Sequence, residues 1–433
     1  MSSNQVLIKS KEIVEASKLQ IHEAQISDSM WTEHIQMYID ACIYIKNILC
    51  NQSIIDNIPS SYTLILLGGI LGNSYTTCKL YCSDKLVSLT KEILNIYLSK
   101  FNVKTTRQLL LLEFNQSSKV NSSTLASQIL KLSVAYLSKS CEKSDDSLTH
   151  YPLVRDTLVW LAMELDYPEL AGFEFISVLQ PFGLRLTEDY RSSIQLVGLS
   201  VLRSLATKAR IADWRQSNRA EAVISQLLDH RIACSPTSPE ILLDEVYSTL
   251  LILTNLLSNT NSANWYEKIT ERLLFDLLME TRYKRQLVLL KHLLKLINTL
   301  KASFSLFTRQ FIKVTSSILL GPRKSTCSDA LATSSESNGY NTVYALMLQC
   351  VSEFVKSCWP LVCPTLLPDL IPILTAFVDL LSWDNKANTS KDEAFHNLKS
   401  LFESLIILEP RLLNDVLQPL CDTVPHLKLY IPC

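Results

Sequence analysis

The clearest hydrophobic pattern in the chain lies in residues 187–206, where apolar residues recur at steps of three and four. These positions share one face of a helix: Ile194, Val197, Gly198, Val201, Leu202 and Leu205. Asp189 can accept from the free amides that begin this helix, so we predict that it is the N-cap. Gly198 costs about 1 kcal/mol relative to alanine within a helix. We therefore predict that Gly198 lets a second helix approach closely.

The same period recurs along most of the chain and predicts an all-α protein. The expected helices cover residues 5–26, 31–50, 63–71, 81–100, 124–138, 152–165, 169–179, 189–207, 265–279, 284–301, 306–320, 340–356, 360–381, 391–408 and 410–420. The glycines at 68, 69 and 72 are expected to end the third of these. Asn218 as N-cap and Glu221 three residues later form a predicted capping box for a further helix. Ser238-Pro239 marks another helix start.

Successive helical pairs recur about every 40 residues, the spacing typical of HEAT and armadillo repeats. One helical pair cannot bury its apolar face alone, so the pattern predicts a right-handed α-solenoid of degenerate HEAT/armadillo-like repeats. We expect four segments. They are divergent N-terminal repeats (1–150), central HEAT-like repeats (151–320), a flexible serine-rich loop (321–340) and C-terminal repeats that dock a partner (341–433).

Composition supports this prediction. The chain has 433 residues, of which 47% are apolar and only 8 are glycine. Folds with many tight turns or phosphate loops need more glycine than this. Formal net charge is −1, and no block of like charge stands out, so we expect no nucleic-acid partner. Only 19% of the residues are charged, which indicates either that the protein keeps apolar surface for partners or that its core is thick.

No signal peptide is recognisable at the N-terminus. The best membrane candidate, residues 365–381, contains two prolines and two aspartates and is shorter than the roughly 20 residues of a span. We therefore expect no membrane association and a cytoplasmic location, with a nuclear one left open. In such a compartment the scattered cysteines, among them Cys42, Cys50, Cys350 and Cys421, are expected to be reduced and buried.

The common catalytic motifs are missing. The sequence contains no P-loop, no dinucleotide fingerprint, no Gly-x-Ser-x-Gly elbow and no His-Glu-x-x-His. Cys78 and Cys82 lie one helical turn apart, but no second pair follows at zinc-finger distance. We expect no metal, no cofactor, no small-molecule substrate and no enzymatic activity. A site assembled from dispersed residues stays open as an alternative.

Two stretches are candidate protein contacts. The basic cluster 282–292 includes Arg282 and Arg285 and forms either a solvated face or a partner-binding ridge. Trp359-Pro360 either wedges a corner between two helices or anchors a partner, because tryptophan is favoured at binding hot spots. Leu367 and Leu370, in the apolar run that follows, are included as candidate contacts.

Three passages together resemble a known family. They are residues 187–202, residues 213–224, and a C-terminal set that runs from Arg282 through 351–362 to 366–381. Their order is similar to that of the Tti-two (Tel-two-interacting protein two) family, a subunit of the Triple T (TTT) complex. The likeness covers residues 150–425. None of these passages is a catalytic signature.

The resemblance implies a non-enzymatic scaffold that joins Tel-two and Tti-one. In that family the trio is a co-chaperone adaptor that works with the ninety-kilodalton heat-shock chaperone. It supports the maturation and stability of phosphatidylinositol-3-kinase-related kinases of the mTOR, ATM and ATR type. The resemblance also implies that the C-terminal helices dock on Tti-one. The alternative is a HEAT-repeat transport or cargo receptor, which would bind a small nuclear GTPase, or another helical-repeat scaffold.

Overall fold

The computed structural model describes residues 2–19, 23–51, 59–76, 80–114, 123–139, 147–170, 173–229, 238–257, 259–321, 334–359, 366–382 and 389–431. The predicted all-α class is confirmed, because the regular structure there is helical apart from one short antiparallel pair. That pair joins β1 (Glu113–Phe114) to β2 (Ser123–Thr124). The chain divides into two compact units, Met1–Val223 and Ile224–Cys433.

The first unit has these helices: α1 (Ser2–Ala16), η1 (Glu23–Gln25), α2 (Asp28–Asn51), α3 (Ser61–Tyr75), α4 (Asp84–Lys100), α5 (Thr106–Leu110), α6 (Leu125–Lys139), α7 (Ser147–His150), α8 (Pro152–Glu164), α9 (Phe173–Thr187), α10 (Ser192–Lys208), α11 (Ile211–Arg215), η4 (Gln216–Asn218) and the first turn of α12 (Arg219–Asp229). Helix α3 packs extensively on α8, and α8 packs on α10. Helix α6 lies against α8 and α9, and α9 lies against α10. The helices from α3 to α10 thus form two adjacent rows, as expected for stacked helical pairs, while α1 and α4 also pack on α3, and α2 packs on α1 and α4.

The helices α3 and α8 form the core of the first unit. Residues 63–73 of α3 and 152–162 of α8 are all buried. A helix that is covered on every side needs neighbours all round. The two helices can approach closely because glycines face α8. A Cβ atom on Gly72 would lie 1.8 Å from the carbonyl oxygen of Asp156, and one on Gly69 would lie 2.4 Å from that of Leu153.

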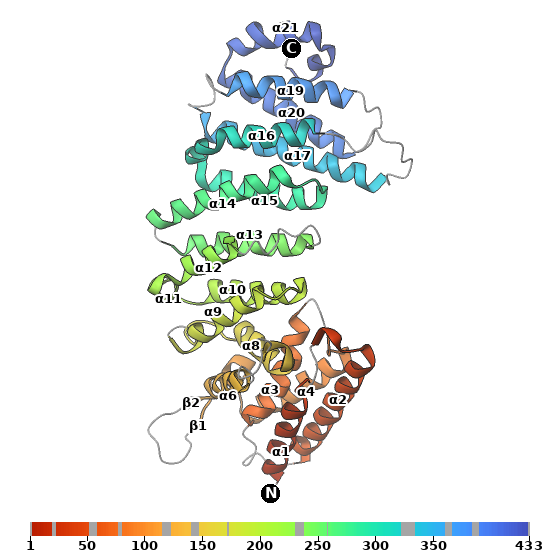
Figure 1. Cartoon of the computed structure of the whole chain (residues 1–433), viewed down its shortest axis with the longest axis vertical. Coiled ribbons are helices and arrows are strands. Elements are labelled where there is room, and N and C mark those ends of the chain that lie inside the picture. Colours follow the sequence, from red (N-terminus) through yellow and green to blue (C-terminus); the bar gives the residue numbers. More distant parts are fainter. Residues whose placement is uncertain are drawn as a thin grey trace. The chain divides into compact units, whose positions relative to one another are not determined.

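The second unit contains α13 (Glu240–Asn255), α14 (Asn259–Met279), α15 (Tyr283–Leu300), η5 (Lys301–Phe307), α16 (Thr308–Leu320), α17 (Ser334–Ser357), α19 (Leu367–Ser382), α20 (Thr389–Leu408), the π-helical turn η7 (Leu413–Leu417), α21 (Gln418–Thr423) and η8 (Pro425–Leu429). One row runs through α13, α15, α17 and α20, each packed on the next. A second row runs through α14, α16 and α19 (Figure 1). This double row is the helical-repeat arrangement that the sequence predicts.

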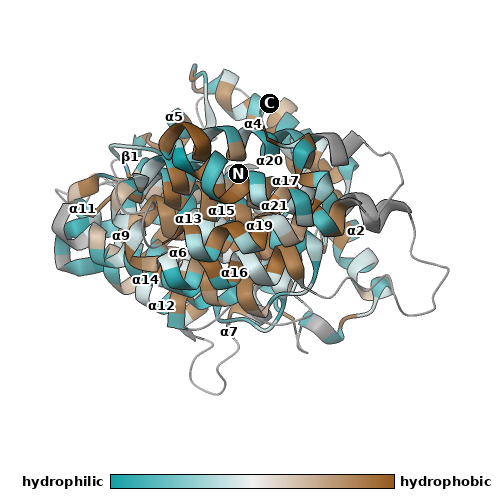
Figure 2. Ribbon diagram, turned by 90° about the horizontal axis from the view of Figure 1, so that it is seen from above, coloured by the Kyte–Doolittle hydropathy of each residue, from teal (hydrophilic) through white to brown (hydrophobic). Residues whose placement is uncertain are grey.

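Aromatic side chains tie the two rows of the second unit together. Phe304 of η5, Phe311 of α16 and Phe354 of α17 are essentially buried, with ring centroids 4.8–5.6 Å apart. Such pairs add about 0.5–1.5 kcal/mol beyond their buried area. In Figure 2 most helices carry both apolar and polar turns, which fits amphipathic helices that bury one side.

Several element boundaries differ from those predicted. The glycines at 68–72 do not end a helix, since α3 continues through them to Tyr75. Part of the predicted loop 321–340 is helical, because α17 begins at Ser334; residues 322–333 lie outside the described part. The division into four segments stays a prediction, although α3 and α8, on either side of residue 150, belong to one compact unit. Within the described residues, every helix falls short of the length or hydrophobicity of a membrane span.

Candidate functional site

The first unit holds a buried cluster of charged side chains. Its centre is Glu23 of η1, whose Oε2 accepts from Nη1 of Arg155 and Nη1 of Arg191, each at 2.8 Å. The side chains of Glu23 and Arg155 are 0% and 2% exposed. Arg191 also pairs with Asp189, with Nη2 2.8 Å from Oδ2. The cluster therefore connects η1, α8 and the residues directly before α10.

Asp156 extends this cluster to α3 and to the segment before α4. Its carboxylate accepts from Arg155 Nε at 2.8 Å, from the Tyr81 hydroxyl at 2.6 Å and from Asn73 Nδ2 at 3.0 Å. All four side chains are buried. Asn73 reaches Asp156 because Gly72 lets α3 lie directly on α8. The same close approach thus serves both apolar packing and polar pairing.

The charged groups in the cluster shift one another's pKa values. Burial would raise the pKa of Glu23, but the charges and hydrogen bonds of Arg155 and Arg191 outweigh it and hold that pKa below its usual range. Burial would also raise the pKa of Asp189, but the hydrogen bonds from Arg191 outweigh it and leave that pKa lowered. Removing one partner of such buried pairs is costly, because the other charge stays buried. We call this cluster the charge clamp, because it joins segments that are distant in the sequence. Its charged groups pair with one another inside the protein.

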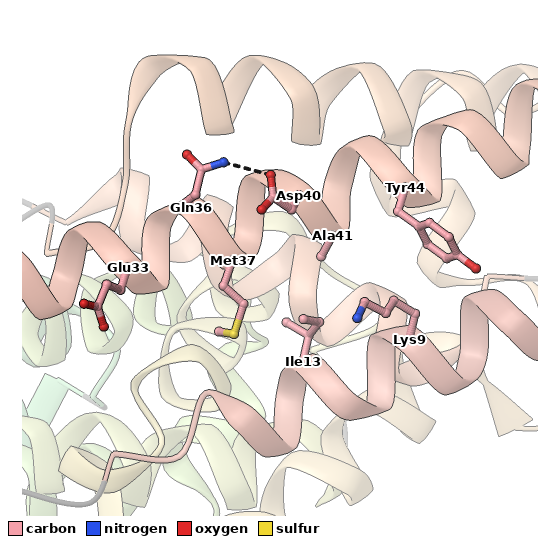
Figure 3. Close-up of a pocket in the computed structure, with 8 residues that line it drawn as sticks. All are labelled: Lys9, Ile13, Glu33, Gln36, Met37, Asp40, Ala41 and Tyr44. Carbon is pink, nitrogen blue, oxygen red and sulfur yellow. Dashed lines mark hydrogen bonds between the residues drawn. The ribbon is translucent and has the colours of Figure 1, made fainter.

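An open groove lies between α1 and α2 on the surface of the same unit (Figure 3). Met37 points toward Ile13 across it, and Tyr44 stands at one end. Glu33 and Asp40 lie on its α2 side, both solvent-exposed. The α2 residues that line the groove recur at three- and four-residue steps.

The two predicted contacts Arg282 and Arg285 differ from each other in exposure. Arg282 is the residue before α15, 42% exposed, with Nε 3.3 Å from Glu280. Arg285 is buried: Nε is 2.5 Å from Glu280 Oε2, and Nη1 is 3.0 Å from the carbonyl oxygen of Ser238. Arg285 therefore tethers the start of α15 to the segment before α13 and offers no surface contact, which corrects the prediction.

The candidate contacts in the C-terminal segment also differ in exposure. Trp359 is half-buried two residues after the end of α17, whereas Pro360 lies outside the described residues. Leu367 is half-buried at the first turn of α19. Leu370 is 0% exposed and belongs to the core, so its prediction as a contact is corrected. Among the described residues of this segment, the most exposed large apolar side chains are Ile407 and Leu429, at 78% and 61% exposure, and the sequence reasoning missed both.

The structural residues show mixed outcomes. Gly198 does face a second helix, since a Cβ there would lie 2.7 Å from the carbonyl oxygen of Gly183 in α9. Asp189 is not the N-cap, because α10 begins at Ser192 after Arg191. Its Oδ1 instead accepts from the Arg191 amide at 2.8 Å. Asn218 directly precedes α12, with a left-handed φ of 54° rather than the extended backbone of a usual N-cap. Glu221 lies in the first turn of α12.

The buried cluster was missed from sequence because its members lie far apart. Arg155 and Glu23 are 132 residues apart, and Arg191 and Glu23 are 168 apart. One local signal was available. Arg155 and Asp156 are adjacent charges inside a helix whose other residues are mostly apolar, and such charges must find partners if the helix is covered on all sides.

No protein-family model and no curated protein matches the sequence. A chain in a solved structure of Kap95p with RanGDP aligns at 12% identity with a TM-score of 0.47. The alignment covers 94% of this chain and 55% of the solved one, so this chain spans about half the length of that protein.

Proposed function

We propose that this protein is a non-enzymatic helical-repeat scaffold that binds other proteins through its helix faces. The proposal rests on one contrast: the buried charged groups pair with each other, whereas the surface has open grooves. The buried charges Glu23, Arg155 and Asp156 are used in internal pairs, whereas the described hollows are open grooves between neighbouring helices. Stacked helical pairs offer extended surfaces of the kind that repeat proteins use for binding.

In its specific form, the proposal is that the chain is a subunit of the TTT complex together with Tel-two and Tti-one. As such it would be a co-chaperone adaptor, with the heat-shock chaperone, for phosphatidylinositol-3-kinase-related kinases. The support is the order of the passages at 187–202, 213–224 and 282–381 described above. A protein of this class acts in the cytoplasm and needs no cofactor.

Docking on Tti-one is proposed for the C-terminal segment 341–433. This segment presents Ile407 on α20, and a groove between α17 and α20 is lined by Glu353, Glu393 and His396. Exposed apolar side chains beside polar groups are typical of protein interfaces.

The experiment is affinity purification of the tagged full-length chain from cells, followed by quantitative mass spectrometry. We expect Tel-two, Tti-one and the kinases in the wild-type sample. Ile407→Asp should deplete them by about tenfold or more, because it buries a charge in the interface. The matched control is Ile241→Asp on α13, where the isoleucine is 60% exposed but lies outside the docking segment. Import receptors with a small GTPase in place of these partners would favour the transport alternative.

A further inference from the structure

A long stretch of the second unit carries only positive charge. Residues 281–328 contain ten Lys and Arg residues and no Asp or Glu. The rest of the chain has 31 basic and 42 acidic residues, so the near-neutral total hides this contrast. The charges are spaced by apolar residues at helical intervals. Its first part is the basic cluster 282–292, which the sequence alone leaves as either a solvated face or a partner-binding ridge.

Helix α15 collects three of these charges on one exposed face. Lys284, Lys291 and Lys295 are all solvent-exposed and follow i, i+7, i+11 spacing, which places them on one side of a helix. At 1.5 Å per residue they are spaced by about 10 Å and about 6 Å along the axis. Val288, half-buried, lies between the first two. We call these three lysines the lysine face.

The lysine face is free to bind. Within the described residues, none of its three ammonium groups makes an ion pair or a hydrogen bond. By contrast, Arg285 in the same helix is turned inward and held by Glu280. Free surface cations keep their full capacity to pair with a partner's carboxylates.

The helices that pack on either side of α15 carry acidic residues. Helix α13 packs on one side of α15, where Asp244 Oδ1 lies 2.7 Å from Nε2 of His292 and its side chain is 53% exposed. Helix α17 packs on the other side and carries Glu353, which pairs with Lys356 at 3.0 Å. Helix α13 contains no Lys or Arg, and the one basic residue of α17, Lys356, is paired, so the unpaired lysines of these three helices lie on α15 alone.

We propose that the lysine face docks an acidic amphipathic helix of a partner protein, with carboxylates at spacings that match Lys284, Lys291 and Lys295. A single helix fits the width of the face, and an apolar residue between its acids can contact Val288. A nucleic-acid backbone or an anionic membrane would extend over the neighbouring acids and be repelled by them. Lysine also lacks the planar fork with which arginine grips phosphate. The inference rests on the proposed protein-binding function and names the chemistry of one partner.

The test uses a fluorescein-labelled synthetic helical peptide of about 18 residues. It carries glutamates at i, i+7 and i+11 and a leucine at i+4, and its binding to the full-length chain is followed by fluorescence anisotropy. We expect Lys284→Glu/Lys291→Glu/Lys295→Glu to weaken binding at least about tenfold. A peptide of the same composition with its glutamates spread around the helix should bind more weakly than the matched one.

The matched control variant is Lys301→Glu/Arg309→Glu/Lys313→Glu. It makes the same charge change at exposed positions of η5 and α16, off the lysine face. Its binding should stay within about threefold of wild type, since distant charges are screened by salt. Equal losses in both variants, no loss in either, or indifference to glutamate spacing would overturn the proposal. So would tighter binding of the wild-type chain to single-stranded DNA or phosphatidylserine vesicles than to the peptide.

Folding is controlled with Lys284→Gln/Lys291→Gln/Lys295→Gln, which removes the charges without adding acids and should also weaken peptide binding. The outcome is separable from that of the proposed adaptor function. If Tel-two and Tti-one fail to co-purify while peptide binding holds, the adaptor proposal falls and the lysine face stands. If they co-purify but the peptide test fails, only this inference falls.

Discussion

The guanidinium of Arg155 lies 2.8 Å from the carboxylate of Glu23, although 132 residues separate them in the sequence. Both side chains are buried. This contact brings the connection between α1 and α2 against α8, at the point where α8 is already pressed on α3. The charge clamp thus lies where α3 and α8 approach closely.

Arg155→Met tests this clamp. The substitution leaves Glu23 and Asp156 without their buried guanidinium, and we expect it to lower the free energy of unfolding by about 3–5 kcal/mol. Urea denaturation followed by circular dichroism measures the change. The control is Arg107→Met, which removes a pair with Glu169 whose arginine is 33% exposed and should cost no more than about 1 kcal/mol. Equal stability of the Arg155 variant and the wild type would show that the clamp is not needed.

Gly72→Ala tests the close approach of α3 and α8. The added methyl carbon would lie 1.8 Å from a backbone oxygen, so the two helices must move apart. We expect a loss of about 1–3 kcal/mol or more, seen as a lower melting temperature. Ser74→Ala, two residues along the same helix, is only half-buried and should change it little. A variant at Gly72 that melts like the Ser74 control would rule out this packing.

Helical spacing was enough to predict the fold, because it is a local property. The face formed by Ile194, Val197 and Leu202 is buried as predicted, and Gly198 meets α9. The same local reasoning failed at Gly72, since a weak helix former looks like a helix end until a partner helix is known. Whether the helix continues through Gly72 depends on its packing against α8.

The polar and surface features were harder to predict. Glu23 and Arg155 look like ordinary surface charges in sequence, and only their long-range pairing reveals a buried role. Arg285 was expected at the surface because it belongs to a basic cluster, but the structure turns it toward Glu280. The burial of single charged residues depends on three-dimensional neighbours, which periodicity cannot supply.

The cysteines should differ sharply in reactivity. Cys50 is exposed, which corrects its predicted burial, whereas Cys42, Cys350 and Cys358 are buried free thiols. Burial raises the pKa of Cys42 to about 12 and that of Cys358 to about 11, and it also raises the pKa of Cys350. Since the thiolate is the reactive form, iodoacetamide should alkylate Cys50 first and the other three only after unfolding. Mass spectrometry of tryptic peptides checks this order; early modification of Cys350 would contradict the packing of α15 on α17.

His292 should make stability depend on pH. Burial lowers the pKa of His292, although the hydrogen bond to Asp244 opposes the shift. Because the folded-state pKa is below the unfolded value of about 6.5, the unfolded chain binds the proton more readily. This contribution to stability is therefore complete above about pH 6.5 and is lost as pH falls through that value toward the folded-state pKa. Urea midpoints between pH 8 and pH 5 should fall less steeply for His292→Gln; identical slopes would refute it.

The most direct test of a protein-binding scaffold is to mix the purified full-length chain with purified Tti-one and measure the mass of the product by light scattering after size exclusion. We predict a stable one-to-one complex whose mass exceeds that of Tti-one by 49.0 kDa. Two separate peaks at the masses of the free proteins, with the chain folded, would contradict the proposed function.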